Sequence, residues 1–145
     1  MPNHFHFLIK PTKENSISLF LSEISNSYTK YFNIKNKRIG SLFQGTFKSK
    51  EANKESVLQL SRYIHLNPIF SSKANLNDSL KKPENYLFSS YREWIKLEKL
   101  KLVDKQELSE WLKIAGGIKN YQKFLESMVD KNPKIGIERL TIEWF

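Results

Sequence analysis

Residues 2–9 read PNHFHFLI, an alternation of polar with aromatic or aliphatic residues that is typical of a half-buried β-strand. Successive side chains of a strand point to opposite faces, so His4 and His6 share one face and the two phenylalanines face a core. From the rise per residue, the imidazoles would lie about 6–7 Å apart, which allows both to bind one divalent metal ion. A pair of surface histidines is the alternative interpretation.

Residues 54–67 are predicted to form a helix, because their apolar residues recur at the spacing of one helix face. Asn53 and Ser56 are candidate caps for its start, and Pro68 is expected to end it. Tyr63 and Asn67 are four residues apart and therefore lie on one side of its last turn. His65 is expected at the surface or against phosphate, and Arg62 is expected to contact phosphate.

The strand and the helix together would form a site for phosphodiester chemistry. The two histidines and Asn67 would be the metal ligands, and the Tyr63 hydroxyl would attack phosphorus. The alternative interpretation of Tyr63 is an amphipathic core tyrosine with its hydroxyl at the surface.

The order of these motifs resembles the single-tyrosine HUH transposases, and most closely the branch of REP-associated tyrosine transposases. The resemblance rests on MPNHFH at residues 1–6 and SRYIHLNP at residues 61–68, with further agreement in SYTKYFN (27–33), RIGSLFQGTFKS (38–49) and YLFSSY (86–91). Several motifs in order are far more specific than any one of them.

The resemblance implies a metal-dependent transposase that cuts single-stranded DNA beside a hairpin through a 5′-phosphotyrosine intermediate. It implies Mg²⁺ or Mn²⁺ bound by His4, His6 and Asn67, with Tyr63 as the nucleophile. It also implies an α+β fold, in which helices pack on an antiparallel sheet of the HUH or ferredoxin-like kind.

The strands that normally precede the HUH strand in this family are absent from the sequence, so the expected fold is truncated at its N-terminus. The HUH strand would then present an unpaired edge. Three explanations stay open: a reading frame that begins upstream of Met1, a decayed copy, or an edge that pairs with a second protomer in a homodimer.

The formal net charge of +9 is concentrated in one stretch between Lys30 and Lys54, where seven basic residues accompany one acidic residue. Aromatic residues are interleaved with them, a combination typical of surfaces that bind single-stranded nucleic acid. A solvated lysine loop is the alternative. The expected DNA-binding residues are Lys35, Lys37, Arg38, Gln44, Lys48, Lys50 and Arg62.

The remaining sequence predicts one HUH-like domain over residues 1–95 and a helical C-terminal extension over residues 96–145. Helices are expected from Asn15 or Ser16 to Asn33, from Ser89 or Ser90 to Ile95, from a cap at Asp104, and from Ile118 to Asp130 after a break at Gly116-Gly117. A second strand is expected over residues 42–50.

Composition excludes several classes of protein. The chain has no cysteine, and therefore no disulfide framework or thiolate metal site. It has no apolar run of transmembrane length and no signal-peptide pattern, so we expect a soluble cytoplasmic protein with no membrane partner. Two rivals to the enzyme stay open: a non-catalytic nucleic-acid-binding remnant of a transposase, and a structural metal-binding module.

Overall fold

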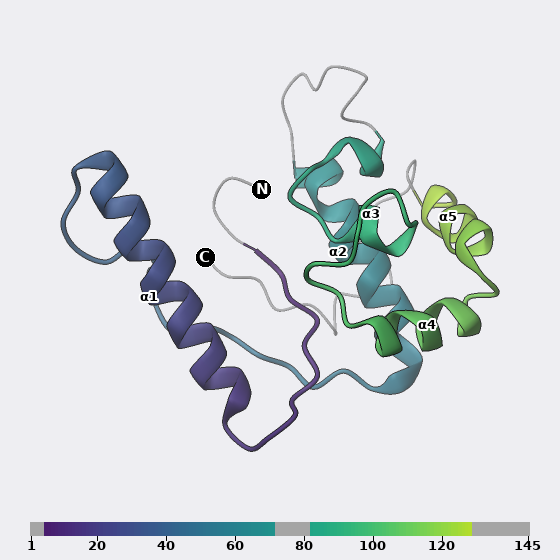
Figure 1. The fold of residues 1–145 in the computed structure, drawn as a ribbon, viewed down its shortest axis with the longest axis horizontal. Coiled ribbons are helices and arrows are strands. Elements are labelled where there is room, and N and C mark those ends of the chain that lie inside the picture. The colour runs from purple at the N-terminus through teal and green to yellow at the C-terminus, as the bar shows by residue number, and fades with distance from the viewer. Residues whose placement is uncertain (1–4, 72–81, 129–145) are drawn as a thin grey trace. The chain divides into compact units, whose positions relative to one another are not determined.

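The structure is a computed structural model that describes residues 5–71 and 82–128 (Figure 1). These residues divide into two compact units, one formed by residues 5–49 and the other by residues 50–71 and 82–128. Within these ranges, no helix combines the length and the apolar character needed to cross a bilayer. The boundary expected between residues 95 and 96 stays a prediction.

The first unit is built on one long helix, α1 (Ser16–Asn36), which confirms the helix predicted from Asn15 or Ser16. At its start, the Ser16 hydroxyl donates a hydrogen bond to the Lys13 carbonyl at 2.7 Å. At its end, Lys37 adopts a left-handed conformation with φ 52°, and the Arg38 N–H donates to the Asn33 carbonyl at 2.9 Å. This closes the last turn in the usual way for a helix C-terminus.

The predicted antiparallel sheet is wrong, because the described residues contain no β-strand. Residues 5–10 and 46–50 have no regular secondary structure, and residues 42–45 are bends. A strand forms only beside a second strand, and the described residues contain no strand for either segment to pair with. The two phenylalanine rings of this segment instead pack against other aromatic rings. The ring centroids of Phe5 and Phe43 lie 5.9 Å apart, and those of Phe7 and Phe20 lie 6.0 Å apart.

The second unit begins with a short 3₁₀ helix, η1 (Lys54–Ser56), which leads directly into α2 (Val57–Ser71). Asn53 caps η1, since its side chain accepts a hydrogen bond from the Ser56 N–H at 3.0 Å. These elements confirm the predicted helix, but the expected end at Pro68 is wrong. Ile69 and Phe70 continue the helix and pack against the hydrophobic core. The partial burial of these two side chains opposes the cost of about 3 kcal/mol for an internal proline.

The described part of this unit contains four further elements: η3 (Pro83–Asn85), α3 (Tyr91–Trp94), α4 (Lys105–Ile114) and α5 (Ile118–Glu126). The predicted cap of α4 is confirmed, because the Asp104 carboxylate accepts hydrogen bonds from the N–H groups of Gln106 and Glu107. The predicted break is also confirmed. Gly116 and Gly117 have φ values of +77° and +96°, a conformation that glycine adopts without steric cost.

The core of this unit forms where α2 meets the later helices. α2 contacts both η3 and α5, which makes it the central helix of the unit (Figure 1). The largest side chains that are fully buried are Leu66 on α2 and Tyr121 and Leu125 on α5. The ring of Tyr121 packs on that of Trp94 with a centroid separation of 4.7 Å.

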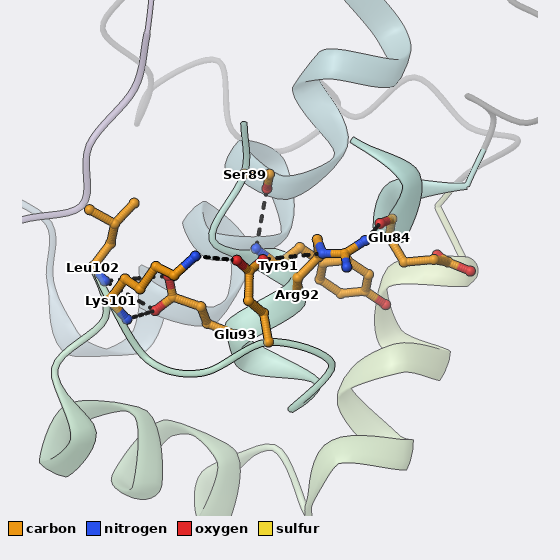
Figure 2. A network of polar contacts seen from close by, with 8 residues as sticks. Glu84, Ser89, Tyr91, Arg92, Glu93, Lys101 and Leu102 are labelled. Carbon is orange, nitrogen blue, oxygen red and sulfur yellow. Dashed lines mark hydrogen bonds and ion pairs between the residues drawn. The ribbon is translucent and has the colours of Figure 1, made fainter. Parts of the chain in front are cut away.

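A buried carboxylate holds the loop between α3 and α4. Glu93 is only 5 % exposed, and its carboxylate accepts hydrogen bonds from the backbone N–H groups of Lys101, Leu102 and Val103 at 3.0–3.3 Å. Figure 2 shows Glu93 with Lys101 and Leu102, beside Arg92, which donates to the Glu84 carbonyl at 2.9 Å. Hydrogen bonds to an ionised acceptor are the stronger kind. Glu93 therefore fixes this loop against α3.

Replacing Glu93 with alanine is expected to destabilise the protein by about 2–4 kcal/mol, because three backbone donors lose their acceptor. Urea unfolding followed by circular dichroism measures the change. Glu110→Ala, an exposed carboxylate on α4, is the matched control and should change the free energy of unfolding by less than about 0.5 kcal/mol. Equal stabilities of the two variants would contradict this role of Glu93.

Candidate functional site

α2 places the predicted nucleophile and one predicted metal ligand in the interior of the second unit. Tyr63 is 3 % exposed and Asn67 is 5 % exposed. Tyr63 forms a small apolar cluster with Leu60, against which Ala52 and Ile64 pack. Because Tyr63 and Asn67 are separated by one helical turn, they lie on the same side of α2. The alternative interpretation placed Tyr63 in the core with its hydroxyl at the surface, and in the structure its side chain is buried.

His65 was expected at the surface or against phosphate; it is 2 % exposed, so the surface position is wrong. Its Nδ1 lies 2.9 Å from the Tyr121 hydroxyl and its Nε2 lies 3.0 Å from the Ser90 hydroxyl. Burial lowers the pKa of His65 to about 3, so the ring is neutral near pH 7. A neutral imidazole has one N–H, so one nitrogen donates and the other accepts.

Tyr121 links this histidine to the preceding turn of α2. Its hydroxyl lies 2.9 Å from the Ser61 hydroxyl as well as 2.9 Å from His65. Burial strongly raises the pKa of the Tyr121 hydroxyl, which stays protonated. Ser61 and His65 are four residues apart and present one polar face of α2 to α5. The Tyr121 hydrogen bonds therefore fix the rotation of the helix that carries Tyr63.

Arg62 lies against α5. Its guanidinium carbon is 4.1 Å from the centroid of the Phe124 ring, a cation–π contact. Burial lowers the pKa of Arg62, and the nearby Tyr121 partly opposes that shift. Arginine remains protonated in proteins, so the contact places a positive charge one residue before Tyr63. Its predicted contact with phosphate stays a prediction.

Sequence reasoning missed the partners that α5 and the loop before α3 supply, namely Tyr121, Phe124 and Ser90. One signal was present, since Ser61 and His65 are spaced by four residues and mark a polar face on an otherwise apolar helix. That spacing does not identify the hydrogen-bond partners, which lie between 25 and 60 positions away along the sequence.

The predicted metal ligands are distributed over different parts of the chain. His6 is half-buried in the first unit, Asn67 is buried in the second, and His4 lies outside the described residues. Over residues 5–71 and 82–128, no group of three or more His, Cys, Asp or Glu side chains is arranged to hold a metal ion. The metal site stays a prediction.

Most of the predicted DNA-binding residues are exposed polar or basic side chains. They follow one another from the end of α1 to the start of the second unit: Lys35, Lys37, Arg38, Gln44, Lys48 and Lys50. Arg62 differs from them, because it is half-buried on α2 against Phe124.

Comparison with known proteins gives one match. Residues 1–67 match the family model described as "Transposase IS200 like", and this segment contains Tyr63 and Asn67 as well as both histidines of the first motif. The curated proteins and the solved structures gave no match. The helices α3, α4 and α5 lie outside the matched segment. Residues 1–67 are therefore similar to an IS200-like transposase domain, and this similarity suggests a transposase.

Proposed function

We propose that this chain cuts and rejoins single-stranded DNA beside a hairpin, with Tyr63 as the nucleophile and a magnesium or manganese ion as the cofactor. The observation that carries the proposal is the family match over residues 1–67, a segment that holds every residue proposed for the chemistry. The REP-associated branch is part of the proposal and rests on the motifs of the sequence.

In the proposed reaction, the Tyr63 Oη forms a bond to the phosphorus of the scissile phosphodiester. The bond between phosphorus and the 3′ oxygen breaks. The phenol loses its proton to solvent, and the leaving 3′ oxygen takes up a proton from solvent. The products are a 5′-phosphotyrosine and a free 3′-hydroxyl. Attack of a 3′-hydroxyl on the phosphotyrosine reverses the bonds and rejoins the strand, so one residue serves both cutting and joining.

The proposed cofactor would be held by His4, His6 and Asn67, two imidazoles and an amide oxygen. Imidazole nitrogen suits transition metals, whereas oxygen donors suit both magnesium and manganese, so this set favours manganese of the two. A bound divalent ion supplies charge neutralisation at a phosphate oxygen. Asn67 is supported as a ligand by its position one turn after Tyr63 on α2.

The exposed basic residues support the proposed substrate. Lys35, Lys37 and Arg38 lie at or just after the end of α1, Lys48 lies near the end of the first unit, and Lys50 begins the second. Each can neutralise a backbone phosphate and release a counterion, which gives affinity without dependence on base sequence. Arg62 adds a charge next to the nucleophile in sequence, and its contact with Phe124 limits its freedom.

Removal of divalent metal is expected to abolish cleavage but not binding. Hairpin oligonucleotides of varied sequence, labelled at the 5′ or 3′ end, are incubated with the full chain in manganese or in EDTA and separated on a denaturing gel. We expect cleaved products in manganese, at least tenfold fewer in EDTA, and at least tenfold fewer with His6→Ala. Exposed Glu110→Ala is the control. Equal cleavage in manganese and EDTA would contradict the metal-dependent mechanism.

The burial of Tyr63 favours a second candidate, a transposase remnant that binds nucleic acid without cutting it. A side chain that is 3 % exposed cannot reach phosphorus until the residues that cover it move. The two candidates differ in one observation. The enzyme needs divalent metal and Tyr63, whereas the binding remnant needs neither and loses affinity only with increasing salt.

A further inference from the structure

The segment from Ile24 to Lys50 is strongly basic and contains no acidic residue. Glu23 and Glu51 flank it, and six basic residues lie between them: Lys30, Lys35, Lys37, Arg38, Lys48 and Lys50. Among the described residues, no carboxylate lies within ion-pair distance of Lys35, Lys37 or Arg38. A segment with six basic residues and no acidic residue of its own fits a polyanion.

The same segment exposes aromatic rings on α1. An amphipathic helix normally buries its apolar stripe, but here Leu21 is the one residue of α1 that is buried. Tyr28 is 49 % exposed and Tyr31 is 56 % exposed, and their ring centroids lie 6.4 Å apart. Stacked nucleotides follow one another at about 3.4 Å, so a segment of two or three nucleotides covers both rings.

Two cations lie beside these rings. The Lys35 ammonium is 5.6 Å from the centroid of Tyr31 and donates a hydrogen bond to its hydroxyl at 3.3 Å. The Arg38 guanidinium is 5.7 Å from the centroid of the Phe32 ring. The turn that carries Arg38 is fixed by Asn33, whose side-chain amide donates to the Gly40 carbonyl at 2.8 Å. The positive charges and the exposed rings therefore lie close together, in the last turns of α1 and in the turn that follows it.

We infer that Tyr28, Tyr31, Lys35 and Arg38, which we call the α1 surface, form a binding site for single-stranded DNA. The bases stack on the tyrosine rings, and the phosphates between them contact Lys35 and Arg38. Stacking on aromatic rings combined with phosphate contacts is how proteins hold single strands without reading their sequence. The choice of DNA as the nucleic acid rests on the proposed function, whereas the site itself rests on the charge and geometry of α1.

The inference is tested by fluorescence anisotropy of a labelled 20-nucleotide oligothymidylate with the full chain in EDTA, which removes any contribution of cleavage. Tyr31→Ala is expected to weaken binding by about 5- to 100-fold, the effect of losing one stacked base. Tyr31→Phe keeps the ring and should bind within about twofold of the wild type. Phe88→Ala removes an aromatic ring that is 88 % exposed in the other unit and is the matched control for loss of an exposed ring.

Salt dependence tests the charged half of the site. Lys35→Gln should reduce the slope of log affinity against log salt by about 0.7, which corresponds to one phosphate contact on a single strand. Lys119→Gln, an exposed lysine on α5, should leave the slope unchanged. Circular dichroism of each variant confirms that it is folded.

Three outcomes would overturn the inference: Tyr31→Ala binding as tightly as Phe88→Ala, Lys35→Gln with an unchanged salt slope, or binding confined to duplex DNA or to RNA. The result is separate from that of the proposed function, because Tyr63→Phe should bind normally in this assay. Intact binding at the α1 surface without any cleavage would contradict only the catalytic proposal. Cleavage that does not depend on Tyr31 would contradict only this site.

Discussion

Acidification from pH 7 to pH 4 is expected to remove about 3 kcal/mol of folding free energy through His65 alone. The pKa of this histidine falls to about 3 in the folded protein, from a reference value of 6.5. Between these two values, the unfolded chain binds a proton that the folded chain does not. Stability is therefore complete above pH 6.5 and declines as the pH falls toward 3, by about 1.4 kcal/mol for each pH unit.

The structural reason lies in the surroundings of the ring. His65 is enclosed by Tyr91, Trp94 and Tyr121, with ring centroids 5.4–6.1 Å away. Its two nitrogens face the hydroxyls of Tyr121 and Ser90, which are neutral and do not offset a buried positive charge. A loss of about 3 kcal/mol is a large part of the 5–15 kcal/mol that stabilises a typical domain.

Urea unfolding at pH 7, 5.5 and 4 measures this effect in the wild type and in His65→Gln. The variant should be less stable at pH 7 but should lose about 3 kcal/mol less on acidification, and carboxylates that titrate in both proteins cancel in the difference. His6→Gln, which changes a histidine of the other unit, should retain the wild-type pH dependence. An identical pH dependence for His65→Gln and the wild type would disprove the role of His65.

Replacement of Tyr63 with phenylalanine is expected to abolish covalent attachment of DNA while leaving the fold intact. The substitution removes one oxygen and keeps the ring that packs with Leu60 and Ala52, so the protein should remain folded. The nucleophile is lost completely, so no phosphotyrosine can form.

Tyr121→Phe is the matched control for this substitution. Its hydroxyl contacts Ser61 and His65, so its loss should destabilise the protein by about 1–3 kcal/mol, but the Tyr63 nucleophile remains. The expected pattern is therefore that Tyr63→Phe loses the covalent product, whereas Tyr121→Phe keeps it. Covalent product from Tyr63→Phe would refute the assignment of the nucleophile.

The helices could be predicted from the sequence because their signals are local. Apolar spacing located α1 and α2, Asp104 marked the start of α4, and the glycine pair at 116–117 separated α4 from α5. These features depend on residues within one or two turns of one another. The similarity of residues 1–67 to the IS200-like transposases could likewise be predicted, because the motifs that carry it are contiguous stretches of sequence.

The strands and the surroundings of α2 could not be predicted in the same way. Alternation around Phe5 and Phe7 indicates two faces, but whether the segment becomes a strand depends on a partner elsewhere in the chain. Pro68 was expected to end α2, yet packing of the residues that follow it outweighs the local cost. The burial of His65 depends on Tyr121, which is 56 residues away in the sequence.

The central claim is that Tyr63 forms a covalent bond to DNA, and peptide mapping by mass spectrometry tests it most directly. The full chain is incubated with hairpin oligonucleotides and manganese, digested with protease and nuclease, and searched for nucleotide attached to any of its six tyrosines. The account predicts a 5′-linked nucleotide on the peptide that contains Tyr63 and on no other. A nucleotide on a different tyrosine, or none on a folded protein that binds the oligonucleotide, would contradict it.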